Sequence, residues 1–271
     1  MSDFIPVNEL DQAIMKLRKS KAALPEFMRA LREGELWALM PWHPEIEDEM
    51  MELKNGDAMP FSQLQDNEGP VVPVFSSHER VEEAIERAKI PPRTYSAAAM
   101  PARQLLEILG KVNLRAVVNK SCRTGEVTIG SDLMRDVASG SAFEAKESEA
   151  TETRKMQILD PADYPTDLVQ PVFELMRQHG CFRAAWIFGR TKEEGDPEGG
   201  RGYQLMVLAE PREAALFHEL NLVANSAKAE GDALELGMIP ENDGAYTAQL
   251  FRMARPFYIA PDYPLPPGAM E

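Results

Sequence analysis

Cysteine and histidine are scarce in this sequence. The 271 residues include two cysteines, Cys122 and Cys181, and four histidines. The cysteines are far apart and form no Cys-x-x-Cys pair, so neither a disulfide framework nor a zinc site is expected. We therefore predict a protein that functions in a reducing cytoplasm and holds no metal or other cofactor.

Long apolar runs and clusters of basic residues are also missing. No apolar run approaches the ~18 residues of a membrane span. The first residues, Met-Ser-Asp-Phe-Ile-Pro-Val-Asn, have neither a basic n-region nor an apolar h-region. We therefore expect a cytoplasmic protein that does not contact a membrane.

The charge is strongly negative in both halves of the chain. Lys and Arg number 29 against 44 Asp and Glu, a formal net charge of −15. Residues 1–150 hold 25 acidic and 18 basic residues, and the remainder holds 19 and 11. Phosphate backbones are repelled by such a surface, so nucleic acid is not expected as a partner.

Known catalytic motifs are absent from the sequence. There is no GxxxxGK[ST] loop, no GxGxxG after a strand and no GxSxG elbow. The run His78-Glu79-Arg80-Val81-Glu82 resembles the HExxH zinc motif but lacks the second histidine. Ser76 and Glu79 have capping-box spacing, and we favour this interpretation.

Cys122 is the strongest candidate for a reactive thiol. It lies near Lys120 and beside Arg123, and cations lower the pKa of a neighbouring thiol. A nucleophile also needs a base to activate it, and none is close in sequence. A passive turn cysteine is therefore the favoured interpretation.

Hydrophobic periodicity indicates an α+β protein. In the first half it predicts helices after Asn8, at 25–34, 77–89, 101–110 and 131–140, and strands at 35–40, 61–64, 70–75, 94–99, 116–119 and 127–129. In the second half it predicts strands at 156–159, 182–188, 203–208 and 246–253, with helices before Gly180 and at 214–227.

The charged segment 139–152 is the predicted domain boundary because it has few apolar residues. We assign residues 1–145 to a domain with a mixed α/β sheet. Residues 153–260 follow the order βαββαβ of a ferredoxin-like domain. Residues 261–271 form a proline-rich tail.

An aromatic and acidic rim is a candidate binding surface. Trp37, Trp42 and His43 precede the acidic segment 45–52. Exposed aromatic rings supply contact area and carboxylates steer a cationic partner. The alternative, which we favour, is a solvated acidic helix packed through Ile46 and its apolar neighbours.

The run Val72-Pro73-Val74-Phe75-Ser76-Ser77, followed by Glu79-Arg80, resembles the SseB family. The resemblance extends from Asn8-Glu9-Leu10 to Asn119, with a separate C-terminal domain over about 155–258. Family members usually read Asn-Pro-Gly where this chain has Asn119-Lys120-Ser121.

The resemblance implies a bacterial cytoplasmic protein of a family named for serine sensitivity on overproduction. Related domains occur near secretion and toxin-immunity loci, and no catalytic residues are established.

Two functional hypotheses follow. The first is a non-enzymatic protein-binding or regulatory module whose partner is a protein, with a basic surface as the best match. A specific form is an immunity or adaptor protein of a toxin or secretion system. The second is an enzyme or sensor for a small amino-acid-like metabolite at the domain interface, with Asn119, Arg123 and His43 converging there.

Overall fold

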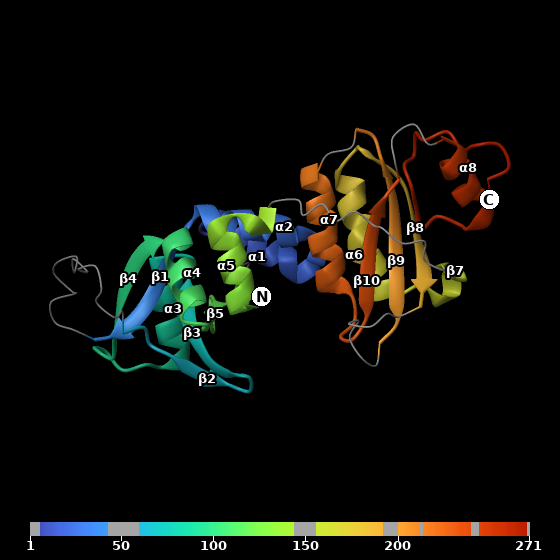
Figure 1. The fold of residues 1–271 in the computed structure, drawn as a ribbon. Helices are drawn as coiled ribbons and strands as arrows, with labels where there is room; N and C mark the ends of the chain where they lie inside the picture. Colours follow the sequence, from blue (N-terminus) through green and yellow to red (C-terminus); the bar gives the residue numbers. More distant parts are fainter. Residues whose placement is uncertain are drawn as a thin grey trace. The chain divides into compact units, whose positions relative to one another are not determined.

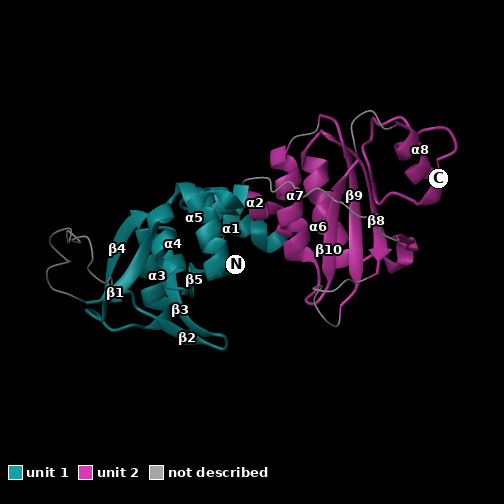
Figure 2. Cartoon of the chain, in the orientation of Figure 1, with its two compact units in different colours: residues 1–19, 26–143 teal, residues 20–25, 144–271 magenta. Residues whose placement is uncertain are grey.

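The computed structural model describes residues 6–42, 60–143, 156–191, 200–211, 214–239 and 244–269 (Figure 1). The chain divides into two compact units (Figure 2). Unit 1 comprises residues 1–19 and 26–143, and unit 2 comprises residues 20–25 and 144–271. Residues 20–25, which lie in the predicted first domain, thus belong to the second unit. Ala22 is buried in the core of unit 2.

The sheet of unit 1 is mixed, as predicted. Its order is β4-β1-β3-β5-β6, with β2 beside β3. β3 and β5 are parallel, and the other pairs are antiparallel. The strands are β1 (Glu35–Pro41), β2 (Leu64–Asp66), β3 (Gly69–Phe75), β4 (Tyr95–Pro101), β5 (Arg115–Val118) and β6 (Val127–Ile129).

Helices cover the central strands of this sheet. The five residues from Val71 to Phe75 in β3 are all buried, as in a strand covered on both faces. The helices are α1 (Glu9–Lys19), α2 (Leu24–Glu33), α3 (His78–Ala88), α4 (Ala102–Lys111) and α5 (Ser131–Ser139). Helix α3 packs on the face that carries Leu39 and Phe75. The predicted elements of this half are confirmed with shifted ends, and β2 lies further along the chain than predicted.

Unit 2 contains a second mixed sheet. Its order is β10-β9-β8-β11, with β7 also paired to β8. The elements are β7 (Met156–Ile158), α6 (Thr166–Gln178), β8 (Phe182–Arg190), β9 (Gly202–Ala209), α7 (Ala214–Ala227), β10 (Ala233–Met238), α8 (Gly244–Met253) and β11 (Tyr258–Ile259). Helices α6 and α7 share one core with the sheet, which includes Leu168, Val172, Leu220 and Val223.

This topology differs from the predicted ferredoxin-like one. In a split βαβ unit, another strand separates the two strands that a helix joins. Here α7 joins β9 and β10, which are direct parallel neighbours. Helix α6 joins β7 and β8, which are direct antiparallel neighbours. The α+β class holds, and the ferredoxin-like arrangement does not describe this sheet.

The predicted strand at 246–253 is wrong, because these residues lie in helix α8. Leu250 and Phe251 of α8 are buried against Trp186, and the rings of Phe251 and Trp186 meet edge to face at 4.9 Å. Tyr263 of the predicted tail stacks on Phe251. The strand that follows α7 is instead β10, which the periodicity did not predict.

No helix among the described residues combines the length and the apolar character that a membrane crossing requires.

We expect Phe251→Ala to destabilise unit 2 by about 3–5 kcal/mol, because it leaves a cavity beside Trp186. Urea unfolding followed by Trp186 fluorescence, in a Trp37→Phe/Trp42→Phe background, measures the change. Met253→Ala is the matched control on the same helix, since Met253 is 41% exposed, and it should change stability by less than about 0.5 kcal/mol. Equal effects of the two substitutions would contradict the assignment of α8 as a packed helix.

Candidate functional site

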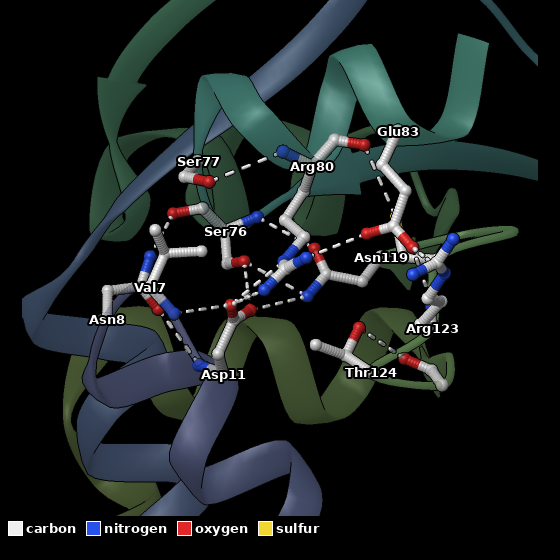
Figure 3. Close-up of polar contacts among 12 residues, drawn as sticks. Val7, Asn8, Asp11, Ser76, Ser77, Arg80, Glu83, Asn119, Arg123 and Thr124 are labelled. Carbon is white, nitrogen blue, oxygen red and sulfur yellow. Dashed lines mark hydrogen bonds and ion pairs between the residues drawn. The ribbon is translucent and has the colours of Figure 1, made fainter. Parts of the chain in front are cut away.

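Polar side chains from four segments of unit 1 meet at the carboxyl ends of β3 and β5 (Figure 3). Asp11 comes from α1, Ser76 follows β3, Arg80 lies in the first turn of α3, and Asn119 follows β5. β3 and β5 are parallel neighbours, so the residues that follow them lie side by side. We call Asp11, Ser76, Arg80 and Asn119 the polar clasp.

The Asp11 carboxylate is the centre of the polar clasp. Oδ1 accepts hydrogen bonds from Ser76 Oγ at 2.6 Å and Asn119 Nδ2 at 3.0 Å. Oδ2 accepts from Arg80 Nε at 2.9 Å, Arg80 Nη2 at 2.7 Å and the Val7 amide at 3.1 Å. A carboxylate offers about four lone-pair positions, and these five donors occupy them.

The polar clasp is closed to solvent. Asp11 and Asn119 have no exposed surface, and Ser76 and Arg80 are 5% and 7% exposed. A buried ion pair stabilises a protein only when its remaining hydrogen-bonding capacity is satisfied, and a buried charge that loses its partner costs several kcal/mol. The satisfied donors of this cluster indicate that it holds the fold together.

Asn119 joins the ends of the two parallel strands. Its side-chain Oδ1 accepts a hydrogen bond from the main-chain amide of Ser76 at 2.9 Å. The main-chain amide of Asn119 donates to the Val74 carbonyl at 2.8 Å. Asn119 and Ser121 have φ values of 54° and 63°, in the left-handed region. Asn tolerates this conformation better than most residues, so it suits the turn as well as the hydrogen bonds.

Arg80 is charged and held from two sides. Burial alone would lower the pKa of Arg80, but hydrogen bonds to Asp11 and Glu83 outweigh it and raise the pKa above its ordinary value. Arg80 Nη1 donates to Glu83 Oε2 at 2.7 Å. The other oxygen of Glu83 accepts from the Arg123 amide at 2.8 Å. Arg123 therefore lies at the rim of the polar clasp, with a side chain that is 59% exposed.

The cap of α3 is Ser77, not the predicted Ser76. The Ser77 Oγ accepts the Arg80 amide, and Ser77 has an extended backbone conformation. Backbone hydrogen bonding and the Ser77 hydroxyl lower the pKa of Glu79. Ser76 donates its hydroxyl to Asp11 instead, which commits it to the polar clasp.

Cys122 is buried, and its environment is the reverse of an activating one. Burial, followed by the charge of Glu83, raises the pKa of its thiol to about 12. Its Sγ donates to the Arg80 carbonyl at 3.3 Å. Arg80 and Arg87 act to lower the pKa of the thiol, but their effect is weaker than that of desolvation. Cys122 therefore has the properties of a structural cysteine.

The aromatic candidates are separate from the polar clasp. Trp37 in β1 is half-buried and meets His78 edge to face, with ring centroids 5.0 Å apart. Trp42 follows β1, and Arg93 lies over its ring at 5.7 Å. His43 and the acidic segment 45–52 lie outside the described residues. The structure thus brings Asn119 and Arg123 together, while Trp37 and Trp42 have other neighbours.

Asp11, Ser76 and Arg80 were not among the predicted site residues. An acidic residue in the first turn of a helix has an ordinary explanation, and so has an arginine within an amphipathic helix. The one local signal is Asn8, whose Oδ1 accepts the Asp11 amide and whose Nδ2 donates to the Ser76 carbonyl. Within the described ranges, no group of three His, Cys, Asp or Glu side chains is arranged to hold a metal ion.

Two domains of one protein family match this chain. The SseB protein N-terminal domain matches residues 10–125, and the SseB protein C-terminal domain matches residues 151–259. The chain belongs to the SseB family. The whole polar clasp lies within the match to the SseB N-terminal domain. No curated protein and no solved structure matches the chain.

We expect Asp11→Asn to destabilise unit 1 by about 3–5 kcal/mol, because it leaves the buried Arg80 charge without its main partner. Urea unfolding followed by Trp37 and Trp42 fluorescence, in a Trp186→Phe background, measures the change. Glu26→Gln is the control, since it removes an exposed ion pair with Lys16 and should cost less than about 1 kcal/mol.

The double variant Asp11→Asn/Arg80→Met should be less destabilised than the sum of the two single variants, by about 1–3 kcal/mol. Additive effects would show that the two side chains do not stabilise each other. Should Asp11→Asn not fold, Ser76→Ala, which removes one hydrogen bond to Asp11, gives a milder test at about 1–3 kcal/mol.

We expect the Cys122 thiol to react slowly with an aromatic disulfide reagent at pH 8. A pKa of about 12 leaves only about one thiolate in ten thousand at this pH. In a Cys181→Ala variant, native protein should therefore react slowly and urea-unfolded protein rapidly. Rapid reaction of the native variant would show an activated thiol.

The raised pKa of the Cys122 thiol also determines how the stability of the protein changes with pH. The native thiol keeps its proton to higher pH than the unfolded one, so the free energy of unfolding falls as pH rises from about 9 toward 12. In Cys122→Ala, the part of this fall in the free energy of unfolding that comes from the thiol should be absent.

Proposed function

We propose that this SseB-family protein is a non-enzymatic bacterial cytoplasmic module that binds a protein partner, and that the partner presents a basic surface. The proposal rests on one observation: the buried polar groups of unit 1 form their hydrogen bonds with one another. Asp11, Arg80 and Asn119 satisfy one another at the carboxyl ends of parallel strands, where α/β proteins commonly bind ligands. The position is filled by the chain's own carboxylate.

The same observation weighs against an enzyme or sensor for an amino-acid-like metabolite. Asn119 was one of the polar groups expected to meet such a ligand, and both ends of its side-chain amide are bonded within the clasp. The backbone amide of Arg123 is committed to Glu83. Cys122 has a raised pKa and donates to a main-chain carbonyl.

The charge of the protein supports a basic partner. A formal charge of −15 creates a field that attracts cationic surfaces and speeds their association. Exposed carboxylates include Glu79, Glu82 and Glu86 on the outer side of α3. Such a field acts mainly on the association rate and on partner choice, and salt screens it.

Affinity capture from native cytosol, followed by reconstitution with the purified partner, tests this function. We expect a binary complex whose Kd rises by at least about tenfold between low and physiological ionic strength, because exposed charge pairs are screened. A partner whose binding is independent of salt would contradict the acidic-surface proposal. Turnover of a metabolite by the purified protein would contradict the non-enzymatic one.

A further inference from the structure

The strand β4 forms an edge of the sheet in unit 1. Among the described residues, the one feature that blocks edge pairing is Pro101, the last residue of the strand. The strand is uncharged over its whole length, and it pairs with β1 over seven consecutive residues without a bulge. Natural proteins commonly protect such edges with charged side chains, bulges or a covering segment. Among the described residues, only β1 pairs with β4.

The hydrogen bonds at both ends of β4 show which backbone groups face outward. The Trp42 amide donates to the Thr94 carbonyl, and the Ala102 amide donates to the Gly34 carbonyl. Hydrogen-bonded pairs alternate along antiparallel strands. Ser96, Ala98 and Met100 therefore bond to β1, and the amides of Tyr95, Ala97 and Ala99 point to the open edge.

The side chains at these outward positions form an apolar surface. Tyr95, Ala97 and Ala99 share one face of the sheet with Trp37, which lies directly opposite Ala99. Trp37, Tyr95 and Ala97 pack against the cluster that contains Leu39 and Phe75, and Ala99 is exposed. We call Trp37, Tyr95, Ala97 and Ala99 the β4 shelf. Its small alanines leave room for the side chains of an added strand.

Acidic side chains of α3 flank the β4 shelf. His78 contacts Trp37 and lies 3.6 Å from Glu82, and Ile85 packs on the same cluster as Tyr95. At 100° per residue, Glu82 and Glu86 continue the side of the helix that carries His78 and Ile85. Both glutamates are exposed, while Arg80 lies on the other side of α3.

We propose that β4 receives an extended, basic segment of the partner protein as an additional strand. This inference rests on the proposed function and assigns β4 as the site where the partner binds. The main chain of the segment bonds to the outward groups of Tyr95, Ala97 and Ala99. One side chain of the segment lies on the β4 shelf, and Lys or Arg two positions away reaches Glu82 or Glu86. Charge selects the segment, since an acidic strand would be repelled.

Amide hydrogen exchange of the full-length protein, measured by NMR, tests the edge directly. In the free protein the Ala97 and Ala99 amides should exchange at least about 100-fold faster than those of Ser96, Ala98 and Met100, which bond to β1. The opposite result, equal protection in dilute protein, would show that the chain itself already covers the edge. Protection that rises with protein concentration would make a second copy the occupant and overturn the proposal.

The occupant is tested with a capped peptide, Val-Thr-Lys-Thr-Val-Thr-Lys-Thr, which places valine and lysine on one face of a strand. It should protect the Ala97 and Ala99 amides, and the analogue with glutamate in place of lysine should not. No protection by the lysine peptide, or equal protection by both peptides, overturns the proposal.

Matched variants separate the backbone contribution from the charge. Ala97→Pro removes an outward amide at an edge position that tolerates proline, and it should weaken peptide binding by at least about tenfold. Ala97→Ser keeps both the amide and a small side chain, and it should bind normally. Glu82→Gln/Glu86→Gln should weaken binding of the lysine peptide, while Asp163→Asn/Asp167→Asn, which changes the net charge equally on unit 2, should not.

The captured partner distinguishes the two proposals. A partner that binds Ala97→Pro as tightly as the parent protein overturns the β4 inference and leaves the proposed function standing. The absence of any binary partner overturns the proposed function, whatever the exchange pattern of the edge.

Discussion

The buried bond between the Asp11 carboxylate and the Arg80 guanidinium is the constraint on which unit 1 depends. It joins the first helix to the helix that follows β3, and through Ser76 and Asn119 it fixes the ends of both parallel strands. A buried charge pair is stable only with complete hydrogen bonding. The position of each of the four segments is therefore determined by the others.

This constraint also directs where function can lie. Polar groups at the carboxyl ends of parallel strands usually face a ligand, but in this SseB-family protein they face an internal carboxylate. The chemistry available to a partner is then that of the surface: exposed glutamates of α3, a half-buried tryptophan and the outward backbone of β4. This set of surface groups is the basis of our proposal that the protein recognises a strand of a protein partner.

Sequence periodicity predicted the first unit well, because its elements have strong local signals. Helix α3 has an apolar stripe and a serine cap, and β3 is a short β-branched run between turns. Sequence periodicity did not predict β10, and it predicted a strand where α8 lies. The segment Ala-Leu-Glu-Leu-Gly-Met of β10 has no β-branched residue, and α8 contains Tyr, Thr and Phe, which favour strands. In α8, the packing of Leu250 and Phe251 against Trp186 favours the helix over the strand.

The candidate site was predictable only in part, for a different reason. Asn119 was expected to matter, but its partners Asp11 and Ser76 are distant in sequence. Each of them has an adequate local explanation, as a helix-terminal acid and as a helix cap. Only the sheet topology, which places the ends of β3 and β5 side by side, reveals that they form one cluster.

The Ser76 amide offers the most direct measurement of the central claim, because it donates to the Asn119 side chain rather than to a backbone carbonyl. Native-state hydrogen exchange in low denaturant should give it the same opening free energy as the buried amides of β3, so that it exchanges only when unit 1 unfolds as a whole. Exchange of Ser76 through a small local opening, well below that free energy, would contradict the claim that the polar clasp holds the fold together.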